Sequence, residues 1–133
     1  MNYINRGFTL IELLVAIAII AILSSTALPT YTSYMQGGRR VDAQHFLLQQ
    51  AAALERQYTR LGGYPDSFDI DSSDYYSFSY QASTSAAATT DANDSTTFVI
   101  TSTPTGSQSG DSCGAMTINQ QGATTPTGSD CWR

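Results

Sequence analysis

The sequence predicts an α+β fold, in which one long amino-terminal helix packs against a small antiparallel sheet of three or four strands. Two observations predict this class. Apolar residues crowd the first third of the 133-residue chain, whereas Ser, Thr, Gly and Asp dominate its last half. Alternating apolar side chains, typical of strands, begin only after residue 74. The length favours a single small domain.

The composition excludes several classes of site. Six arginines and eleven acidic residues give a net charge of -5, which argues against a general nucleic-acid binder because phosphates require a basic surface. One histidine, His45, is too few for a histidine-cluster metal site, and two cysteines allow one disulfide but no four-thiolate zinc site. No spacing of Ser, His or acidic residues singles out a catalytic set, so we expect neither an enzyme nor a bound cofactor.

The first element is an apolar run from Phe8 to Leu28. At about 1.5 Å per residue, a helix of this length crosses a hydrocarbon core of roughly 30 Å. The only charged residue before the run is Arg6. A basic residue on the short side places residues 1–6 in the cytoplasm and the body of the chain outside.

Glu12 stands near the start of this apolar run. A carboxylate at this depth costs about 2.5 kcal/mol or more on insertion scales, so it needs a partner or a function. A cleaved secretory signal or a plain membrane anchor would explain the run but not the acid. Alternatively, Glu12 lies near the interface and its side chain reaches the water.

Residues 7–12, with the sequence GFTLIE, resemble the processing motif of type IV pilins and of the related pseudopilins of type II secretion. The resemblance continues through the apolar run to Pro29, where pilins commonly carry a helix-kinking proline. It implies that a prepilin peptidase in the membrane cuts between Gly7 and Phe8 and methylates the new amino group of Phe8. That cation could pair with Glu12 of the same chain or of a neighbouring subunit.

The helix is expected to continue beyond the membrane, over residues 8–61 in all. From Val41 to Leu61 the apolar residues follow a helical period. The predicted buried stripe consists of Leu47, Ala51, Leu54, Tyr58 and Leu61. The pair at residues 62–63, both glycines, should end the helix. Another glycine pair, at residues 37–38, either breaks the helix or forms a flexible joint.

The segment after the helix is too polar to fold alone. Residues 62–133 contain 25 Ser and Thr but only four branched aliphatic residues, so we expect the helical stripe to supply half of the core. Three stretches alternate like half-buried strands, and their inward side chains are predicted to be Tyr76, Phe78, Tyr80, Phe98, Ile100, Met116 and Ile118. Residues 81–95 and 103–112 are expected to be long loops.

The resemblance also implies how the end of the chain is closed. Pilins usually join two cysteines around a carboxy-terminal loop, and Cys113 with Cys131 resembles the arrangement of PilE-type minor pilins. Two buried free thiols are the alternative. Trp132 is expected to pack near the disulfide.

Two weaker signals concern possible ligands. Four aspartates, Asp66, Asp69, Asp71 and Asp74, lie close together and provide oxygen atoms that suit calcium, but they lack the EF-hand spacing, so we expect a solvated acidic loop and no metal site. The segment 91–95 contains an Asn-x-Ser glycosylation acceptor at Asn93.

The resemblance implies three regions: a leader at 1–7, a membrane and assembly helix at 8–35, and a head outside the cytoplasm at 36–133. Within the head, 36–61 is helix, 62–74 is a loop, and 75–133 holds the sheet and the disulfide loop. The implied function is that of a pilus subunit, as in a minor pilin, which polymerises through its helix and supports twitching motility and adhesion.

The implied partners are other pilin subunits, the prepilin peptidase and the inner-membrane assembly machinery. The chain would reside in the inner membrane with its body in the periplasm, and then in a surface pilus. A pseudopilin of type II secretion is the near alternative. A membrane-anchored DNA-uptake module is a more distant one, which the acidic body disfavours.

Overall fold

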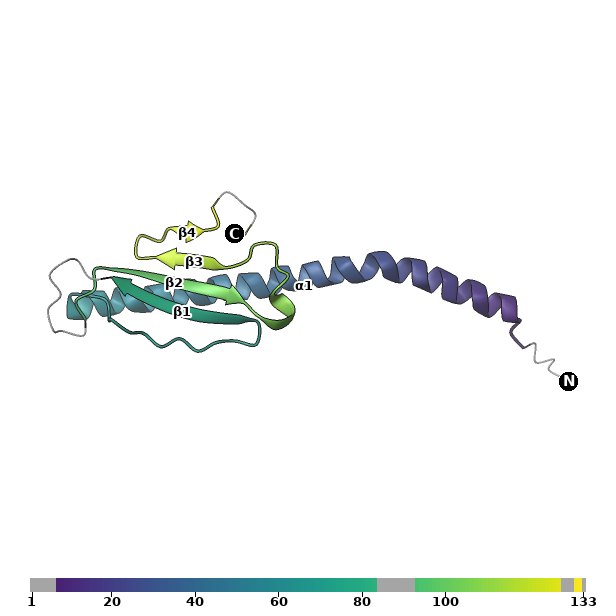
Figure 1. Cartoon of the computed structure of the whole chain (residues 1–133), viewed down its shortest axis with the longest axis horizontal. Coiled ribbons are helices and arrows are strands. Elements are labelled where there is room, and N and C mark those ends of the chain that lie inside the picture. Colours follow the sequence, from purple (N-terminus) through teal and green to yellow (C-terminus); the bar gives the residue numbers. More distant parts are fainter. Residues whose placement is uncertain (1–6, 84–92, 128–130, 133) are drawn as a thin grey trace, which may run out of the picture. The chain divides into compact units, whose positions relative to one another are not determined.

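The computed structural model describes residues 7–83, 93–127, 131 and 132. In chain order the elements are α1 (Leu10–Leu61), β1 (Tyr76–Ser83), β2 (Thr97–Pro104), the short 3-10 helix η1 (Gly106–Gln108), β3 (Met116–Asn119) and β4 (Thr124–Thr125) (Figure 1). The chain divides into two compact units, of which the first ends at Met35 and the second, the head, begins at Gln36. The predicted α+β class, with a long helix and a four-stranded sheet, is confirmed.

Helix α1 is continuous over its 52 residues. The glycine pair at residues 37–38 lies within it, so it does not break the helix. The sequence predicts a helix that begins at Phe8. In the structure the helix begins at Leu10, because Thr9 caps its first turn. The side-chain oxygen of Thr9 accepts a hydrogen bond of 3.3 Å from the backbone N–H of Glu12.

The end of α1 at Leu61 confirms the prediction from the second glycine pair. Gly62 adopts a φ of +85°, which L side chains rarely adopt, and its N–H donates to the carbonyl of Tyr58 at 2.8 Å. The next residue, Gly63, packs so tightly that an added Cβ would collide with the backbone carbonyl of Asn93. A glycine is therefore required at position 62 by its backbone conformation and at position 63 by the lack of space for a Cβ atom.

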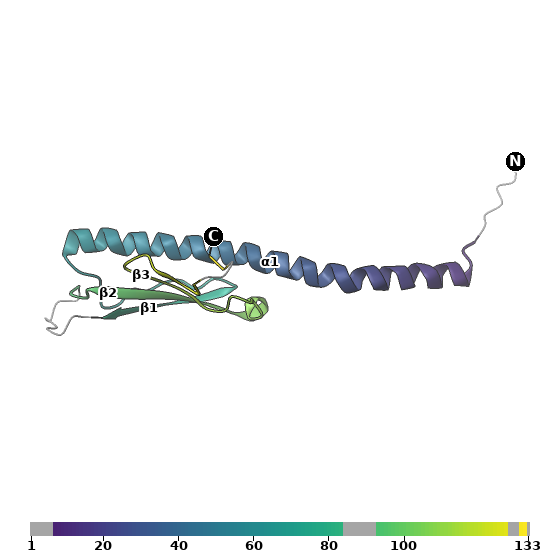
Figure 2. The ribbon, with the colours of Figure 1, turned by 90° about the horizontal axis from the view of Figure 1, so that it is seen from above.

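The sheet is a simple antiparallel series in the order β1-β2-β3-β4. Its register places Ile100 of β2 between Tyr80 of β1 and Ile118 of β3, while Thr124 of β4 pairs with Ile118. Figure 2 shows the sheet lying along the part of α1 that belongs to the head. Helix and sheet thus form the two layers of the head.

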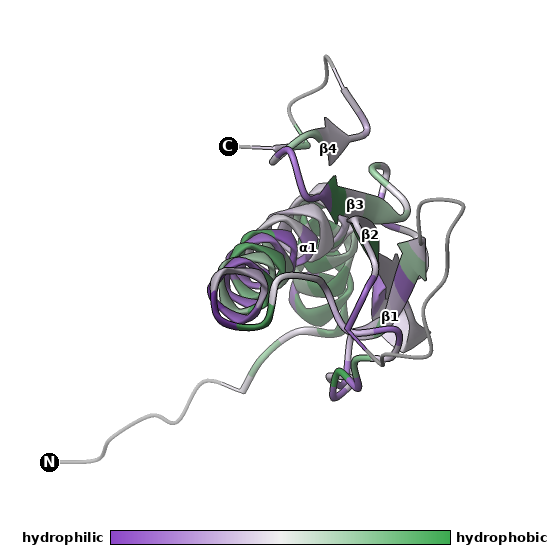
Figure 3. Ribbon diagram, turned by 90° about the vertical axis from the view of Figure 1, so that its left-hand side faces the viewer, coloured by the Kyte–Doolittle hydropathy of each residue, from purple (hydrophilic) through white to green (hydrophobic). Residues whose placement is uncertain are grey.

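The core lies between these two layers. Seen end-on in Figure 3, strongly hydrophobic residues of β3 lie beside α1. The predicted inward faces are confirmed, because Phe98, Ile100, Met116 and Ile118 are each at most 2% exposed. Tyr76 is equally buried, and Phe78 and Tyr80 pack against the core with part of their surface in solvent.

The buried face of α1 differs from the predicted stripe. Its buried residues are Ala43, Gln44, Leu47, Ala51 and Leu54. Tyr58 and Leu61, expected to be buried, are 39% and 56% exposed. The reason is that the chain turns back and inserts Tyr64, whose ring lies 4.7 Å from that of Tyr58 and 4.8 Å from that of Phe98. Tyr64 fills the position that the last helical turn was expected to fill.

Two predicted loops are also corrected. Residues 81–83 of the expected loop 81–95 extend β1, and residues 84–92 lie outside the described residues. Most of the other expected loop, 103–112, is ordered by β2, η1 and two buried polar residues, Gln108 and Asp111. A buried hydrogen-bond network, absent from any local sequence pattern, accounts for this order.

Candidate functional site

In the first unit, the apolar side chains of α1 are not covered by other described residues of the chain. An 18-residue window of α1 has a mean hydropathy of 2.4, and none of it is buried in the single chain. Its side chains are exposed; that of Ile22, for example, is 69% exposed. By length and composition this helix could cross a membrane. Exposure of such an apolar surface to water is unfavourable, so it must be covered by lipid or by other protein.

The predicted processing residues lie at the start of this unit. Gly7 and Phe8 precede α1, and Phe8 is 87% exposed. Glu12 lies in the first turn of α1 and is exposed. Within the described part of the single chain, no cation pairs with its carboxylate. The structure therefore brings Gly7, Phe8 and Glu12 to one end of the helix.

Pro29, the third predicted assembly residue, lies inside α1, where it cannot donate the usual helical hydrogen bond. Nearby hydroxyl groups donate to backbone carbonyls of the same helix. Thr30 donates to the carbonyl of Thr26 at 3.1 Å, and Thr32 donates to that of Pro29 at 2.9 Å. Since these hydroxyls are satisfied within the helix, they do not oppose an apolar environment.

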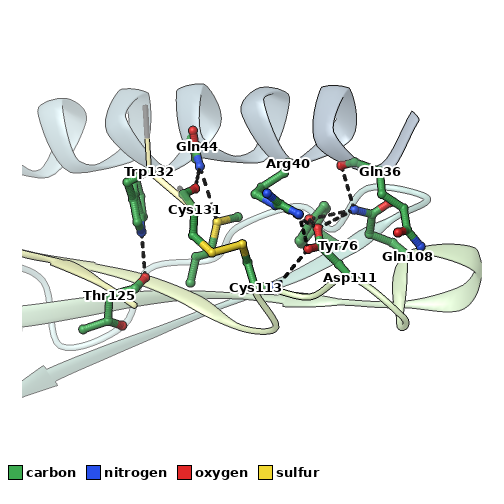
Figure 4. The surroundings of a disulfide bond; sticks show 11 residues. Gln36, Arg40, Gln44, Tyr76, Gln108, Asp111, Cys113, Thr125, Cys131 and Trp132 are labelled. Atoms are coloured by element: carbon green, nitrogen blue, oxygen red, sulfur yellow. Dashed lines mark hydrogen bonds and ion pairs between the residues drawn. A yellow bond between two sulfur atoms is a disulfide. The ribbon is translucent and has the colours of Figure 1, made fainter. Parts of the chain in front are cut away.

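In the head, a buried carboxylate joins α1 to the segment before the disulfide (Figure 4). Asp111 forms an ion pair with Arg40, with one hydrogen bond of 3.1 Å from Nε and one of 2.5 Å from Nη2. Tyr76 Oη donates to the same carboxylate at 3.0 Å, Gln108 Nε2 at 2.7 Å, and the backbone N–H of Cys113 at 2.9 Å. The carboxylate thereby satisfies five donors at once.

These contacts set the protonation of the group. Burial by itself raises the pKa of Asp111, but the hydrogen bonds from Arg40, Cys113, Tyr76 and Gln108 outweigh it and leave the pKa below the usual value. The hydrogen bond to Asp111 raises the pKa of Arg40. Burial raises the pKa of Tyr76 to about 12. The ion pair is thus charged on both sides at neutral pH.

The disulfide between Cys113 and Cys131, with Cα atoms 5.7 Å apart, is confirmed. Gln44 of α1 donates through Nε2 to the backbone carbonyl of Cys131. Trp132 donates through its indole N–H to the carbonyl of Thr125 at 2.7 Å and packs against the core. Figure 4 shows that Cys131 is bonded to Gln44 of α1, whereas Cys113 is linked to α1 through Asp111 and Arg40.

Little in the sequence indicates this network. Arg40 lies next to Arg39, and Gln108 and Asp111 lie in the run 103–112, which the sequence predicts to be a long loop. Arg39 itself stacks on the ring of Tyr75, with its guanidinium carbon 3.8 Å from the ring centre. Both arginines therefore fasten α1 to the rest of the head.

The remaining charges of the head lie on its surface. His45 is exposed, and Arg56 and Arg60 border one hollow on the exposed side of α1. Among the described residues, no three His, Cys, Asp or Glu side chains are placed to hold a metal ion. In the possible acceptor sequence, Asn93 accepts a hydrogen bond from Gln57 at 3.3 Å, and the serine two residues later is buried.

Comparisons with known proteins agree with these features. Residues 4–28 match a profile described as the prokaryotic N-terminal methylation motif. Residues 29–117, more than half of the chain, match the profile of "Type IV minor pilin ComP, DNA uptake sequence receptor". The two matches meet between Leu28 and Pro29.

The chain is also similar to individual pilins. It is 39% identical to a type IV pilin from Shewanella oneidensis of known structure, with a TM-score of 0.62, over 74% of this chain and 98% of that one. The minor pilin PilV of Neisseria meningitidis shares the fold, with a TM-score of 0.51 at 22% identity, over 75% and 96% of the two chains. The type IV major pilin PilE1 of Neisseria gonorrhoeae is 38% identical over 66 residues, which are 50% of this chain and 40% of that protein.

An exposed apolar helix, the methylation motif at its start and a disulfide-closed head define a type IV pilin. Within that class, the chain belongs to the family of the type IV minor pilin ComP. The methylation motif implies processing by a prepilin peptidase. These matches favour a pilus subunit over a secretion pseudopilin.

Proposed function

We propose that this chain is a minor subunit of a type IV pilus, cut between Gly7 and Phe8, methylated on the amino group of Phe8, and polymerised through residues 8–35. One observation carries the proposal: the apolar part of α1 is wholly exposed in the single chain and has Glu12 in its first turn. In the membrane, lipid covers this surface. In a fibre, the same helices of neighbouring subunits replace the lipid by close packing.

Cleavage would give Glu12 its missing partner. The cut at Gly7 creates an α-amino cation on Phe8, four residues before the acid. A charge pair in an apolar interior is strongly penalised when one member is absent. A pairing between the cation of one subunit and Glu12 of the next would therefore fix the stagger of the helices.

The proposed partners follow from this assembly. They are other pilin subunits, the prepilin peptidase and the inner-membrane assembly machinery. Before assembly the chain would cross the inner membrane once, with the head in the periplasm, and afterwards it would be part of a surface pilus. The role is structural, and no step in it requires catalysis by this chain.

Mass spectrometry of the chain recovered from sheared surface fibres tests the processing step. We expect a mature chain that begins at Phe8 and carries one added methyl group. A chain in fibres that still begins at Met1 would contradict the proposal. Fibres from cells without the prepilin peptidase provide the control, and they should contain none of this chain.

The role of Glu12 is tested by Glu12→Ala, with Asp69→Ala as a matched control on the exposed surface of the head. Membrane insertion of Glu12→Ala should equal that of the wild type, because a costly charge has been removed from the apolar segment. Incorporation into fibres should fall by about tenfold or more, because the partner cation is left unpaired. Normal incorporation of Glu12→Ala would remove this residue from the proposed mechanism.

A second candidate function is DNA binding, which the description of the matched family favours. The net charge of -5 opposes it. Among the described residues, Arg56 and Arg60 form an exposed basic pair that could contact phosphates. Binding of labelled duplex DNA to the full chain in detergent, at physiological salt, tests this function. If the pair contacts phosphates, Arg56→Gln with Arg60→Gln should lower the salt slope of the binding constant by about 2. Arg39→Gln, whose side chain is already held by Tyr75, serves as the control.

A further inference from the structure

No other part of the described chain covers the segment that contains the proposed cleavage site. Gly7, Phe8 and Thr9 all precede α1 and have no regular secondary structure. Phe8 is 87% exposed. A Cβ placed on Gly7 would have no heavy atom within 4 Å. The Gly7–Phe8 bond therefore lies in accessible, non-helical backbone, only two residues before a 52-residue helix.

The side chain that sets this boundary is Thr9. Its Oγ1 accepts from the N–H of Glu12 at 3.3 Å, and its carbonyl accepts from the N–H of Leu13 at 3.2 Å. This is the arrangement of an N-cap residue, whose carbonyl takes the first helical bond while its side chain satisfies a free N–H of the first turn. The Thr9-Leu10-Ile11-Glu12 sequence also has the spacing of a capping box.

A cap at this position matters because a helix is a poor substrate for cleavage. A bond inside a helix must first open before a protease can bind it, so cleavage follows the population of the open form. A helix that started one turn earlier would enclose both Gly7 and Phe8. An N-cap residue has non-helical backbone angles and so stops this extension.

We propose that Thr9 is a positioning residue for processing: its cap starts α1 at Leu10 and so keeps the Gly7–Phe8 bond outside the helix, where the peptidase can bind it. This inference rests on the proposed processing between Gly7 and Phe8. It assigns the hydroxyl of Thr9 a role before assembly, separate from that of the charge of Glu12 within the fibre.

The test uses the full chain in proteoliposomes as a substrate for purified prepilin peptidase. Thr9→Ala removes the cap and introduces the best helix former, whereas Thr9→Ser and Thr9→Asn keep a capping side chain. Loss of the cap shifts the equilibrium toward the longer helix by typically about fivefold, and by about thirtyfold at most. Because only the open form binds, we expect KM to rise by up to about this factor while kcat stays unchanged.

The matched control is Thr26→Ala, which removes a hydroxyl from the same helix that is bonded at 3.1 Å to the carbonyl of Leu23. We expect its KM and kcat to equal those of the wild type. In a second measurement, the ¹³Cα chemical shift of Phe8 in micelles should move toward helical values in Thr9→Ala, but not in Thr9→Ser.

Several outcomes would overturn the inference. An unchanged KM in Thr9→Ala would show that the cap does not control access to the bond. A loss of kcat shared by the alanine, serine and asparagine variants would show that the peptidase reads the threonine side chain directly. If the wild-type chain itself is not cut between Gly7 and Phe8, the proposed processing fails, and this result is distinct from both of the others.

Discussion

Replacement of Asp111 by asparagine should strongly destabilise the head. The carboxylate accepts five hydrogen bonds, two of them from Arg40, and its side chain is fully buried. Asp111→Asn removes the charge and turns an NH₂ group toward a set of donors. Breaking one side of a buried ion pair costs about 3 kcal/mol or more. For a unit of about 100 residues, this corresponds to a fall in Tm of roughly 12 to 24 °C.

Thermal unfolding of the full chain in detergent micelles, followed by the fluorescence of Trp132, measures this effect. Asp69→Asn, on an exposed side chain, is the matched control and should shift the Tm by no more than about 2 to 4 °C, which corresponds to the limit of about 0.5 kcal/mol for surface changes. A double-mutant cycle with Arg40→Leu should show that the two costs are not additive, because both changes disrupt one ion pair. A Tm of Asp111→Asn equal to that of the control would refute the reasoning.

The same carboxylate predicts a dependence on pH. Since its pKa in the folded head lies below the ordinary aspartate value of 3.8, its contribution to stability is fully present above that value. The contribution is lost as the pH falls through the lowered pKa of the folded state. The difference in Tm between the wild type and Asp111→Asn should therefore be constant near neutral pH and shrink in acid below about pH 4.

Three further predictions concern packing and the backbone, each measured as a change in the free energy of unfolding. Leu54→Ala should cost about 2 to 5 kcal/mol and Leu61→Ala less than 1 kcal/mol, because only the first side chain is buried; equal costs would contradict the assigned core face. Gly38→Ala should be neutral or stabilising by up to about 1 kcal/mol, since its surroundings are open, whereas Gly63→Ala should destabilise through a backbone collision. Cys113→Ser should cost about 3 kcal/mol, and addition of a reductant should then have no further effect on this variant.

Much of the fold could be predicted because it depends on local patterns. The alternation around Phe98 and Met116 reflects the two-residue period of a strand, which fixes the inward face whatever the partner. The glycine pair after Leu61 ends α1 for a reason that concerns only its own backbone. The motif at residues 7–12 likewise indicates its chemistry without any knowledge of the head.

The rest could not be predicted because the partners lie far apart in the chain. Asp111 and Arg40 are separated by 71 residues, and a Ser- and Gly-rich run gives no sign that one of its acids is buried. The exposure of Tyr58 has a similar origin, since Tyr64 takes its place in the core only after the chain has turned back. A helical period identifies a face of α1 but not where along that face the sheet ends.

The hydrogen bonds that fasten α1 to the disulfide loop also impose an order in time. Gln44 is bonded to a residue 87 positions later, and Arg40 to one 71 positions later. The ribosome makes those later residues last. The donors of Arg40 and Gln44 therefore remain bonded to water until the chain has been made through Cys131, so the head cannot close before that residue is present.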